Sequence, residues 1–285
     1  MSPKQLRIGQ IKYTNTLPVY FFFDEARFDD KIDFILQVPA QLNAAMARGE
    51  IDVGPISSFS YAEHHEQYLV LPGLSISAKR RVRSIYLFSK RPIEELDGAH
   101  IALTNTSATS VNLLKIILEK FLRYTVTYQT QAPVLEEMLA HADGALLIGD
   151  DALLAYRNNN GYHVYDLAEL WYRYTGYSMT FAVWAVRKEA IEKHPGLLRD
   201  VHAAFLESKE RSLQHLEQVV EAVTAQFGEE PSSWFEYFRG LCYDFTEEER
   251  RGLEHYYACA AELGLLRSPV KVRIWEEAVQ PGSTR

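Results

Sequence analysis

The sequence predicts an α/β protein made of two lobes. Residues 6–58 and 101–151 share one order of features: strand, polar turn, helix, strand, proline-started helix, strand and polar turn. Alternating strands and helices favour parallel strands joined by right-handed crossovers. The 285 residues are enough for two such units. We expect residues 1–89 and 187–285 to form the first lobe and residues 90–186 the second.

The composition is typical of a globular protein in water. Hydrophobic residues make up 47% and charged residues 24% of the chain. A net charge of -8 argues against nucleic acid as a partner. The N-terminus lacks the apolar core of a secretory signal, and no apolar run reaches the roughly 20 residues that span a membrane. Two cysteines, Cys242 and Cys259, give neither a disulfide framework nor a zinc pattern, so we expect a cytoplasmic protein.

The first lobe is expected to begin with a strand at 6–11 and a polar turn at 12–16. Thr16 is a candidate N-cap, and Pro18 fits the first turn of the short helix that follows. The consecutive aromatic residues at 20–23 are core residues or ligand-stacking rings. We favour the core, because consecutive side chains cannot all face one cleft.

The remaining elements of the first lobe follow from the same patterns. They are a strand at 33–38, a helix from Pro39 to Gly49, a strand at 51–53, a hydroxyl-bearing turn at 54–58, and strands at 69–74 and 84–89. The basic segment 79–83 steers an anion or is a solvated turn between two strands, and we favour the turn. We place the crossing into the second lobe at 90–92.

The second lobe is predicted in the same way. Its expected elements are strands at 100–103, 125–130, 144–148 and 162–167, and helices at 111–123, 133–139, 151–157 and 168–176. The apolar strand at 180–187 is the expected return crossing. From Glu189 the chain is predicted to be helical, and Thr246 with Glu249 forms a capping box. These helices are expected to pack on the first lobe, and their aromatic residues are core or a dimer face, with the core favoured.

The turn at 104–110 carries five hydroxyl side chains in seven positions. It opens a helix, where free backbone N–H groups and the positive end of the helix dipole favour an anion. Capping alone is the alternative, but a cap needs only one hydroxyl. The turn has no lysine and no P-loop pattern, so it is not a nucleotide phosphate loop.

Four polar turns, at 12–16, 54–58, 104–110 and 149–151, follow strands of the predicted sheets. Ligands of such sheets bind beyond the carboxyl ends of the strands, so two facing lobes would bring these turns together. The candidate neutral donors are Asn15, Ser57, Ser58, Ser84, Thr106, Ser107, Thr109 and Ser110. This set suits a small molecule rich in carboxylates.

Other site chemistries are poorly supported. Asp150 and Asp151 supply a general base, or they charge a helix N-terminus. The adjacent His64 and His65 face different directions on a helix, so a metal site is not expected. Neither a nucleophile elbow nor a dinucleotide-binding glycine pattern is present.

Six motifs in order resemble the chorismate dehydratases of the futalosine route to menaquinone. The matching residues are 11–18, 51–58 with Ser84, 104–110, 147–153, Asp166-Leu167 with Trp171, and 181–185. The resemblance covers roughly residues 6–265. One departure is Tyr177-Ser178 after Thr175-Gly176, where the family usually has Leu-Pro.

The resemblance implies a two-lobed fold like type II periplasmic binding proteins, with two hinge strands and a cleft between the lobes. It also implies dehydration of chorismate, a small dicarboxylate, to 3-[(1-carboxyvinyl)oxy]benzoate without a cofactor. Asn15 would orient the leaving hydroxyl or the enolpyruvyl group, and Ser84 would donate to a carboxylate or to developing negative charge.

The same resemblance suggests the residues that bind the substrate. Tyr13 and Trp171 would form walls of the cleft. The carboxylate-binding turns would supply the remaining contacts, from Ser57, Ser58, Thr106, Ser107, Thr109, Ser110 and Asp150.

Three other functions share these features: a non-catalytic solute-binding protein, a ligand-sensing domain, and the dihydroxynaphthoate synthase of the same pathway. The absent signal segment argues against the first, and the lack of room for a partner domain against the second. The third usually carries Ser-Pro-Cys-Pro-Asn-Asp where this chain has Tyr-Thr-Asn-Thr-Leu-Pro. Both a monomer and a homodimer are compatible with the sequence.

Overall fold

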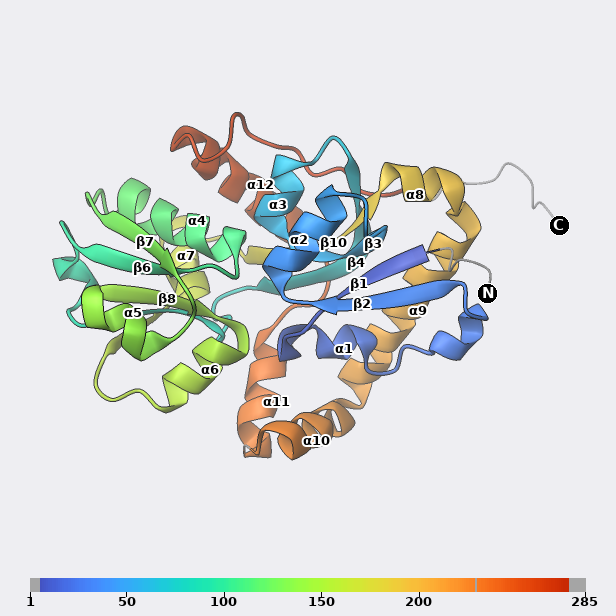
Figure 1. The fold of residues 1–285 in the computed structure, drawn as a ribbon, viewed down its shortest axis with the longest axis horizontal. Coiled ribbons are helices and arrows are strands. Elements are labelled where there is room, and N and C mark those ends of the chain that lie inside the picture. The colour runs from blue at the N-terminus through green and yellow to red at the C-terminus, as the bar shows by residue number, and fades with distance from the viewer. Residues whose placement is uncertain (1–5, 229, 277–285) are drawn as a thin grey trace.

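Two five-stranded sheets form the centres of two lobes in a computed structural model that describes residues 6–228 and 230–276 (Figure 1). The first sheet has the order β2-β1-β3-β10-β4 and the second the order β7-β6-β8-β5-β9. The strands of the first sheet are β1 (Leu6–Ile11), β2 (Ile32–Gln37), β3 (Val53–Ser57), β4 (Tyr68–Ala78) and β10 (Met179–Arg187). Those of the second are β5 (Ile85–Ser89), β6 (His100–Thr104), β7 (Thr127–Gln131), β8 (Gly144–Ile148) and β9 (His163–Asp166).

The pairing confirms the predicted parallel crossovers and adds one antiparallel strand to each sheet. β1 pairs in parallel with β2 and β3, and β6 pairs in parallel with β7 and β8. β10 runs antiparallel to β3 and β4, and β5 runs antiparallel to β8 and β9. The carboxyl ends of β1, β3, β6 and β8 therefore lead into the four polar turns.

Two strands lie on the other side of the boundaries that we predicted. β5 belongs to the second sheet, so the chain leaves the first sheet in residues 79–84 and not at 90–92. β10 belongs to the first sheet, so the return precedes Met179. An apolar strand has the same pattern in either sheet, which is why the sequence could not assign these two. The ends of the predicted first lobe, residues 1–5 and 277–285, lie outside the described residues.

β3 also differs from the prediction, because Gly54 and Pro55 were expected to start a turn after residue 53. The strand instead continues to Ser57 and pairs with β10 up to Ala182. On the other side it pairs with β1 only through Ile8 and Val53, so Pro55 has no strand partner there. A Cβ atom at Gly54 would lie 2.8 Å from the carbonyl oxygen of Gly9, so only glycine allows this approach.

Helices cover both sheets. Those of the first lobe and the C-terminal segment are α1 (Leu17–Tyr20), α2 (Pro39–Ala47), α3 (Ser58–Glu63), α8 (Lys188–Lys193), α9 (Pro195–Gln214), α10 (Leu216–Phe227), α11 (Pro231–Gly240) and α12 (Glu247–Glu262). Those of the second lobe are α4 (Ala108–Lys115), continued by the π-helix η4 (Ile116–Phe121), α5 (Leu135–His141), α6 (Gly149–Arg157) and α7 (Leu167–Thr175). Short 3-10 helices are η1 (Thr14–Thr16), η2 (Glu25–Phe28) and η3 (Ile93–Glu95).

Several helix starts differ from the predicted ones. α4 begins three residues earlier than expected, because Ser107 accepts a hydrogen bond from the backbone N–H of Ser110 and caps it. α5 begins after Pro133, which lies in the extended connection. Thr16 precedes α1 as predicted, but its hydroxyl bonds to the carbonyl oxygens of Ile11 and Tyr13 and does not cap the helix. The capping box of Thr246 and Glu249 is confirmed.

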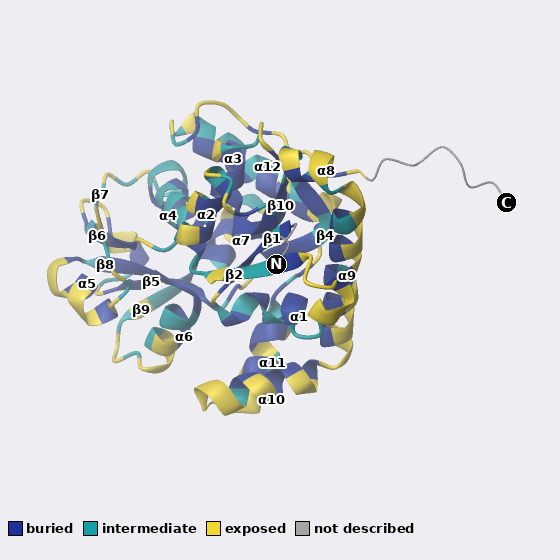
Figure 2. Cartoon of the chain, turned by 45° about the vertical axis from the view of Figure 1, so that its right-hand side comes forward, coloured by how far each residue is buried: buried dark blue, intermediate teal, exposed yellow. Residues whose placement is uncertain are grey.

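The core runs through both sheets and into the C-terminal helices (Figure 2). Most of the C-terminal aromatic residues are buried, as favoured above, and α12 packs on α3 and β10 and also reaches α4 of the second lobe. Among residues 20–23, Tyr20 is buried and the three phenylalanines are half-buried. In the described part of the chain no helix is long and apolar enough to cross a membrane.

The basic segment 79–83 is a connection between β4 and β5, as we favoured. Three of its cations form ion pairs with carboxylates: Lys79 with Glu248, Arg81 with Glu169, and Arg83 with Glu236. Such partly exposed pairs contribute little to stability, but they neutralise three of the four cations of the segment. The fourth, Arg80, lies over the ring of Tyr172. The described residues contain no group of three or more His, Cys, Asp or Glu side chains placed to hold a metal ion.

Candidate active site between the two lobes

The turn after β1 meets the turn after β8 across the two lobes. Thr14 in η1 donates to Oδ1 of Asp150 through its hydroxyl at 2.7 Å and its backbone N–H at 3.4 Å. Asp150 lies in the first turn of α6, which starts at Gly149 and not at 151 as expected. The helix N-terminus there favours a negative charge. We call the group Thr14, Ser84, Gly149 and Asp150 the Asp150 junction.

Gly149 allows this junction to close. Its backbone N–H donates to the carbonyl oxygen of Ser84 at 2.7 Å, which ties the start of α6 to the start of β5. Its φ is +62°, and a Cβ atom there would lie 3.0 Å from the ring of Tyr13. The ring of Tyr13 therefore covers the backbone of the opposite lobe, consistent with the wall expected of this residue.

Burial dominates the electrostatics of the Asp150 junction. It raises the pKa of the Asp150 carboxyl, and the two hydrogen bonds from Thr14 oppose that rise. Burial also raises the pKa of the Tyr13 hydroxyl, which the Thr106 side chain lowers. The contact between Tyr13 and Thr106 places the hydroxyl-rich turn of the second lobe beside the same junction.

Asn15 and Ser84, the two residues predicted at the reacting centre, lie in this region, and their hydrogen bonding within the protein is incomplete. Oδ1 of Asn15, in the same turn as Thr14, is buried and has no hydrogen-bond partner among the described residues. The hydroxyl of Ser84 is buried and donates a long hydrogen bond, 3.4 Å, to the carbonyl oxygen of Val82. Buried polar groups are nearly always paired, so the unpaired Asn15 Oδ1 and the weakly bonded Ser84 hydroxyl favour this region as a candidate binding site.

A second contact between the lobes uses Ser58 and Thr109. Their hydroxyl oxygens are 3.2 Å apart, and the Thr109 hydroxyl also accepts from the backbone N–H of Phe59 at 2.9 Å. The Ser58 hydroxyl donates to the carbonyl oxygen of Thr180 at 2.7 Å. Both side chains are fully buried. We call Ser58, Phe59 and Thr109 the Thr109 junction.

Two tyrosines of α12 complete the Thr109 junction. Tyr257 donates to the carbonyl oxygen of Ser58 at 2.6 Å, and Tyr256 donates to that of Thr109 at 3.1 Å. With these bonds the polar atoms of the junction are paired within the protein. The structure therefore places Ser58 and Thr109 in a lobe–lobe contact, away from the free donors that we expected of them.

Other predicted donors are used for local structure. Ser57 caps α3 through the backbone N–H of Ser60, and both its hydroxyl and its backbone N–H bond to Asn43. The remaining pairs lie in the 104–110 turn, where Thr106 bonds to Thr104 and Ser107 bonds to Ser110. Ser107 and Ser110 thus perform the capping role that was one of the two interpretations of this turn.

Trp171 lies in the core and not on a wall of a cleft. Its side chain is fully buried, and its indole N–H donates to the carbonyl oxygen of Ser178 at 3.2 Å. Its ring packs near Phe121 and Tyr256. The departure from the family pattern at Tyr177-Ser178 therefore contacts Trp171 through this hydrogen bond.

Tyr237 of α11 lies beside the candidate site and was not among the residues predicted from the sequence. Burial raises the pKa of its hydroxyl, the Ser84 hydroxyl lowers it, and the Asp150 carboxyl raises it further. These influences place the hydroxyl beside the Asp150 junction. In the sequence Tyr237 is one of several aromatic residues at helical spacing, a pattern typical of core, so no local signal marked it.

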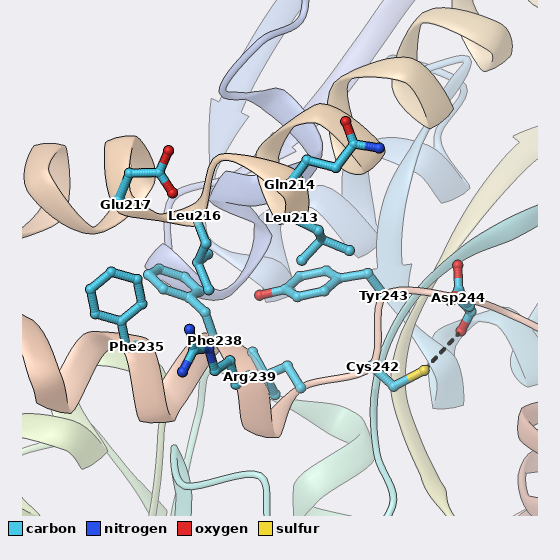
Figure 3. A pocket seen from close by; sticks show the side chains of 11 residues that line it. Leu213, Gln214, Leu216, Glu217, Phe235, Phe238, Arg239, Cys242, Tyr243 and Asp244 are labelled. Carbon is cyan, nitrogen blue, oxygen red and sulfur yellow. Dashed lines mark hydrogen bonds between the residues drawn. The ribbon is translucent and has the colours of Figure 1, made fainter.

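Two of the cavities that adjoin α11 differ in their relation to the predicted site. One of about 390 Å³ lies between α10, α11 and the segment that follows, and includes none of the predicted site residues (Figure 3). Tyr243 projects its ring into it (Figure 3). The other, of about 300 Å³, is lined by Tyr237, Arg83 and Arg157 together with residues of β5, α6 and β9. Tyr237 therefore borders both this second cavity and the Asp150 junction.

This fold, with a polar contact at the carboxyl ends of the parallel strands of two lobes, defines a protein of the periplasmic-binding-protein-like class. Protein AF1704 of Archaeoglobus fulgidus has a similar structure, with a TM-score of 0.73 at 18% identity over 93% of this chain and 100% of that one. The sulphonate-binding protein SsuA of Escherichia coli has a TM-score of 0.70 at 19% identity over 100% of this chain and 96% of that one. At such identities these likenesses show the fold alone.

The chain belongs to the menaquinone biosynthesis family, whose model matches residues 6–262. It is 32% identical to the chorismate dehydratase of Thermus thermophilus over 92% of this chain and 97% of the relative. It is 22% identical to the 1,4-dihydroxy-6-naphtoate synthase of the same organism over 91% of this chain and 95% of the relative. The chain is therefore an enzyme of menaquinone biosynthesis.

Proposed function

We propose that this enzyme dehydrates chorismate to 3-[(1-carboxyvinyl)oxy]benzoate, the first step of futalosine-dependent menaquinone formation. The observation that carries the proposal is the 32% identity to a chorismate dehydratase over nearly the full length of both chains. The buried, neutral and incompletely paired groups of Asn15 and Ser84 support it.

The proposed reaction removes one molecule of water from the ring. The hydroxyl and a hydrogen from the neighbouring carbon, which carries the enolpyruvyl ether, leave, and the ring becomes aromatic. Because aromatic stabilisation drives the step, the protein mainly has to fix the substrate conformation and exclude water. Asn15 would orient the leaving hydroxyl or the enolpyruvyl group, and Ser84 would donate to a substrate oxygen that gains negative charge.

The two lobes divide the proposed binding of the substrate. The first lobe contributes Tyr13 and Asn15, and the second contributes Ser84, Thr106 and the start of α6 with Asp150. A dicarboxylate would be held by hydroxyl, amide and backbone N–H donors, because three of the four cations of the 79–83 segment are already paired with carboxylates. The bound substrate would complete the hydrogen bonding of buried groups that now lack it.

Incubation of the purified enzyme with chorismate, followed by chromatography for the benzoate product, tests the proposal. We expect the product to form without an added cofactor or metal. Tight binding of chorismate without turnover would favour a solute-binding protein. Formation of a dihydroxynaphthoate from the substrate of the sister enzyme, with chorismate unchanged, would assign the chain to that activity instead.

A further inference from the structure

Tyr237 carries a buried hydroxyl that the protein leaves without a partner. Only 2% of the residue is exposed, and its hydroxyl has no hydrogen-bond partner among the described residues. Leaving a hydroxyl buried and unpaired costs roughly 1–3 kcal/mol. A buried, unpaired hydroxyl in a folded enzyme requires an explanation, and one explanation is that a ligand supplies its hydrogen-bond partner.

The surroundings of this hydroxyl belong to both lobes. The groups that change the pKa of Tyr237 include the hydroxyls of Ser84 and Thr14 and the carboxyl of Asp150. Thr14 follows β1 in the first lobe, whereas Ser84 and Asp150 border the second sheet. Because burial raises the pKa, the hydroxyl keeps its proton at neutral pH and acts there as a donor.

No described residue accepts that proton within hydrogen-bond geometry in the unliganded protein. The neighbouring hydroxyls use their own protons elsewhere: Thr14 donates to Oδ1 of Asp150, and Ser84 donates to the carbonyl oxygen of Val82 at 3.4 Å. Oδ1 of Asn15, in the turn that carries Thr14, is also buried and unpaired. The Tyr237 hydroxyl is thus an unpaired donor, and Asn15 Oδ1, in the turn that carries Thr14, is an unpaired acceptor. This pair suits a ligand that has both oxygen acceptors and a hydroxyl donor.

We infer that Tyr237 binds the substrate directly, donating a hydrogen bond to one of its oxygens within the site that Asn15 and Ser84 form. The inference rests on the proposed function for the identity of the substrate. It makes α11 a third structural element of the site beside the two lobes. Chorismate fits this arrangement, because its carboxylates and ether supply acceptors and its ring hydroxyl supplies a donor.

Comparison of Tyr237→Phe with Tyr68→Phe tests the inference. Tyr68 is a matched control, since it is fully buried and its hydroxyl also lacks a hydrogen-bond partner among the described residues. In the backbone register of β4 and β10, Tyr68 lies opposite Arg187, at the end of the strand pair that is far from the second lobe. The other end, where Ala78 lies opposite Met179, leads to the second lobe. The two substitutions remove the same atom from equally buried positions, one at the junction and one remote from it.

For Tyr237→Phe we expect kcat/KM for chorismate to fall roughly ten- to hundredfold, the effect of losing a hydrogen bond to a charged group. The unfolding temperature should not fall, because the lost hydroxyl has no partner in the unliganded protein. Tyr68→Phe should leave kcat/KM unchanged. Both variants should be measured beside the wild type with chorismate as the substrate.

An unchanged kcat/KM for Tyr237→Phe would overturn the inference while wild-type turnover upheld the proposed function. A loss of activity together with a lower unfolding temperature would also overturn it, since the hydroxyl would then support the fold. Absence of turnover in the wild type would instead refute the proposed function, and with it the assignment of chorismate to Tyr237.

Discussion

The two contacts between the lobes use similar side chains but differ in what they leave unpaired. At the Thr109 junction, hydroxyls from Ser58 and Thr109 bond to each other and to backbone groups, and two tyrosines of α12 bond to the adjacent carbonyl oxygens. At the Asp150 junction, Thr14 and Asp150 are bonded, but Asn15 Oδ1, in the same turn as Thr14, and the nearby Tyr237 hydroxyl are buried without partners among the described residues. The first contact is fully paired within the protein, whereas the second leaves two buried polar groups near it unpaired, as expected if a ligand binds there.

The difference shows which polar groups belong to structure and which to function. Buried hydroxyls that are paired within the protein stabilise the contact in which they lie. Buried groups that lack a partner lower stability, and a fold tolerates them where another molecule supplies the partner. A single such group, like the Tyr68 hydroxyl, is no evidence for a ligand, whereas Asn15 and Tyr237 lie near one contact between the lobes. We therefore take the Thr109 junction as the contact that holds the lobes in position and the Asp150 junction as the candidate site.

The largest effect is expected from Asn15→Ala. If Asn15 orients the substrate at the reacting centre, its loss should lower kcat by about 10²–10³-fold, as for other polar groups that act in a transition state. The protein should stay folded, because the Oδ1 atom removed has no partner among the described residues. Steady-state kinetics with chorismate and circular dichroism together measure both outcomes.

Asn159→Ala is the matched control for this variant. The Asn159 side chain bonds to the backbone N–H and carbonyl of Tyr162, so it fixes the loop after α6. Its loss should lower the free energy of unfolding by about 1 kcal/mol per hydrogen bond and leave kcat unchanged. If Asn15→Ala behaved like Asn159→Ala, Asn15 would be a structural residue and the comparison of the two junctions would fail.

The Thr109 junction should show the opposite pattern. Thr109→Val keeps the shape of the side chain but leaves the backbone N–H of Phe59 without its partner. We expect the free energy of unfolding in urea to fall by roughly 1–3 kcal/mol, with kcat per folded molecule nearly unchanged. Thr130→Val, at an exposed position of β7, should change neither quantity. A large loss of kcat at unchanged stability would return Thr109 to the carboxylate-binding role first expected of it.

The sequence predicted the elements that periodicity and capping determine. β1 and β8 begin and end at the predicted residues, and the Thr246 capping box forms. The meeting of polar turns from both lobes was also predictable, because the carboxyl ends of parallel strands lie at one edge of a sheet. Asp150 and Thr14 confirm this meeting with a direct hydrogen bond.

The sequence could not predict which hydroxyls stay free. Ser58 and Thr109 are 51 residues apart in the chain, and only the folded protein shows that they pair with each other. Tyr237 could not be predicted for a related reason. An aromatic residue on an amphipathic helix shows the same sequence pattern whether its hydroxyl contacts solvent, core or substrate. The lobe boundaries failed at β5 and β10 because an apolar strand fits either sheet.

The smallest effect concerns the dependence of stability on pH. Burial raises the pKa of Asp150 above its unfolded value, so the folded protein binds this proton more tightly than the unfolded chain. The resulting penalty is absent below the unfolded pKa and grows as the pH rises through the folded pKa. Asp150→Asn removes the ionisation and keeps an oxygen that accepts from Thr14.

The Asp150→Asn variant should therefore be at least as stable as the wild type at neutral pH, and this advantage should shrink as the pH falls toward the unfolded pKa of Asp150. Urea denaturation at several pH values from acid to neutral measures the difference. Asp29→Asn, at an exposed position remote from both junctions, is the control and should leave the profile unchanged. A wild-type advantage that instead grew with pH would mean that Thr14 stabilises the charged carboxylate more than burial destabilises it. The Asp150 junction would then resemble the Thr109 junction as a contact selected for stability.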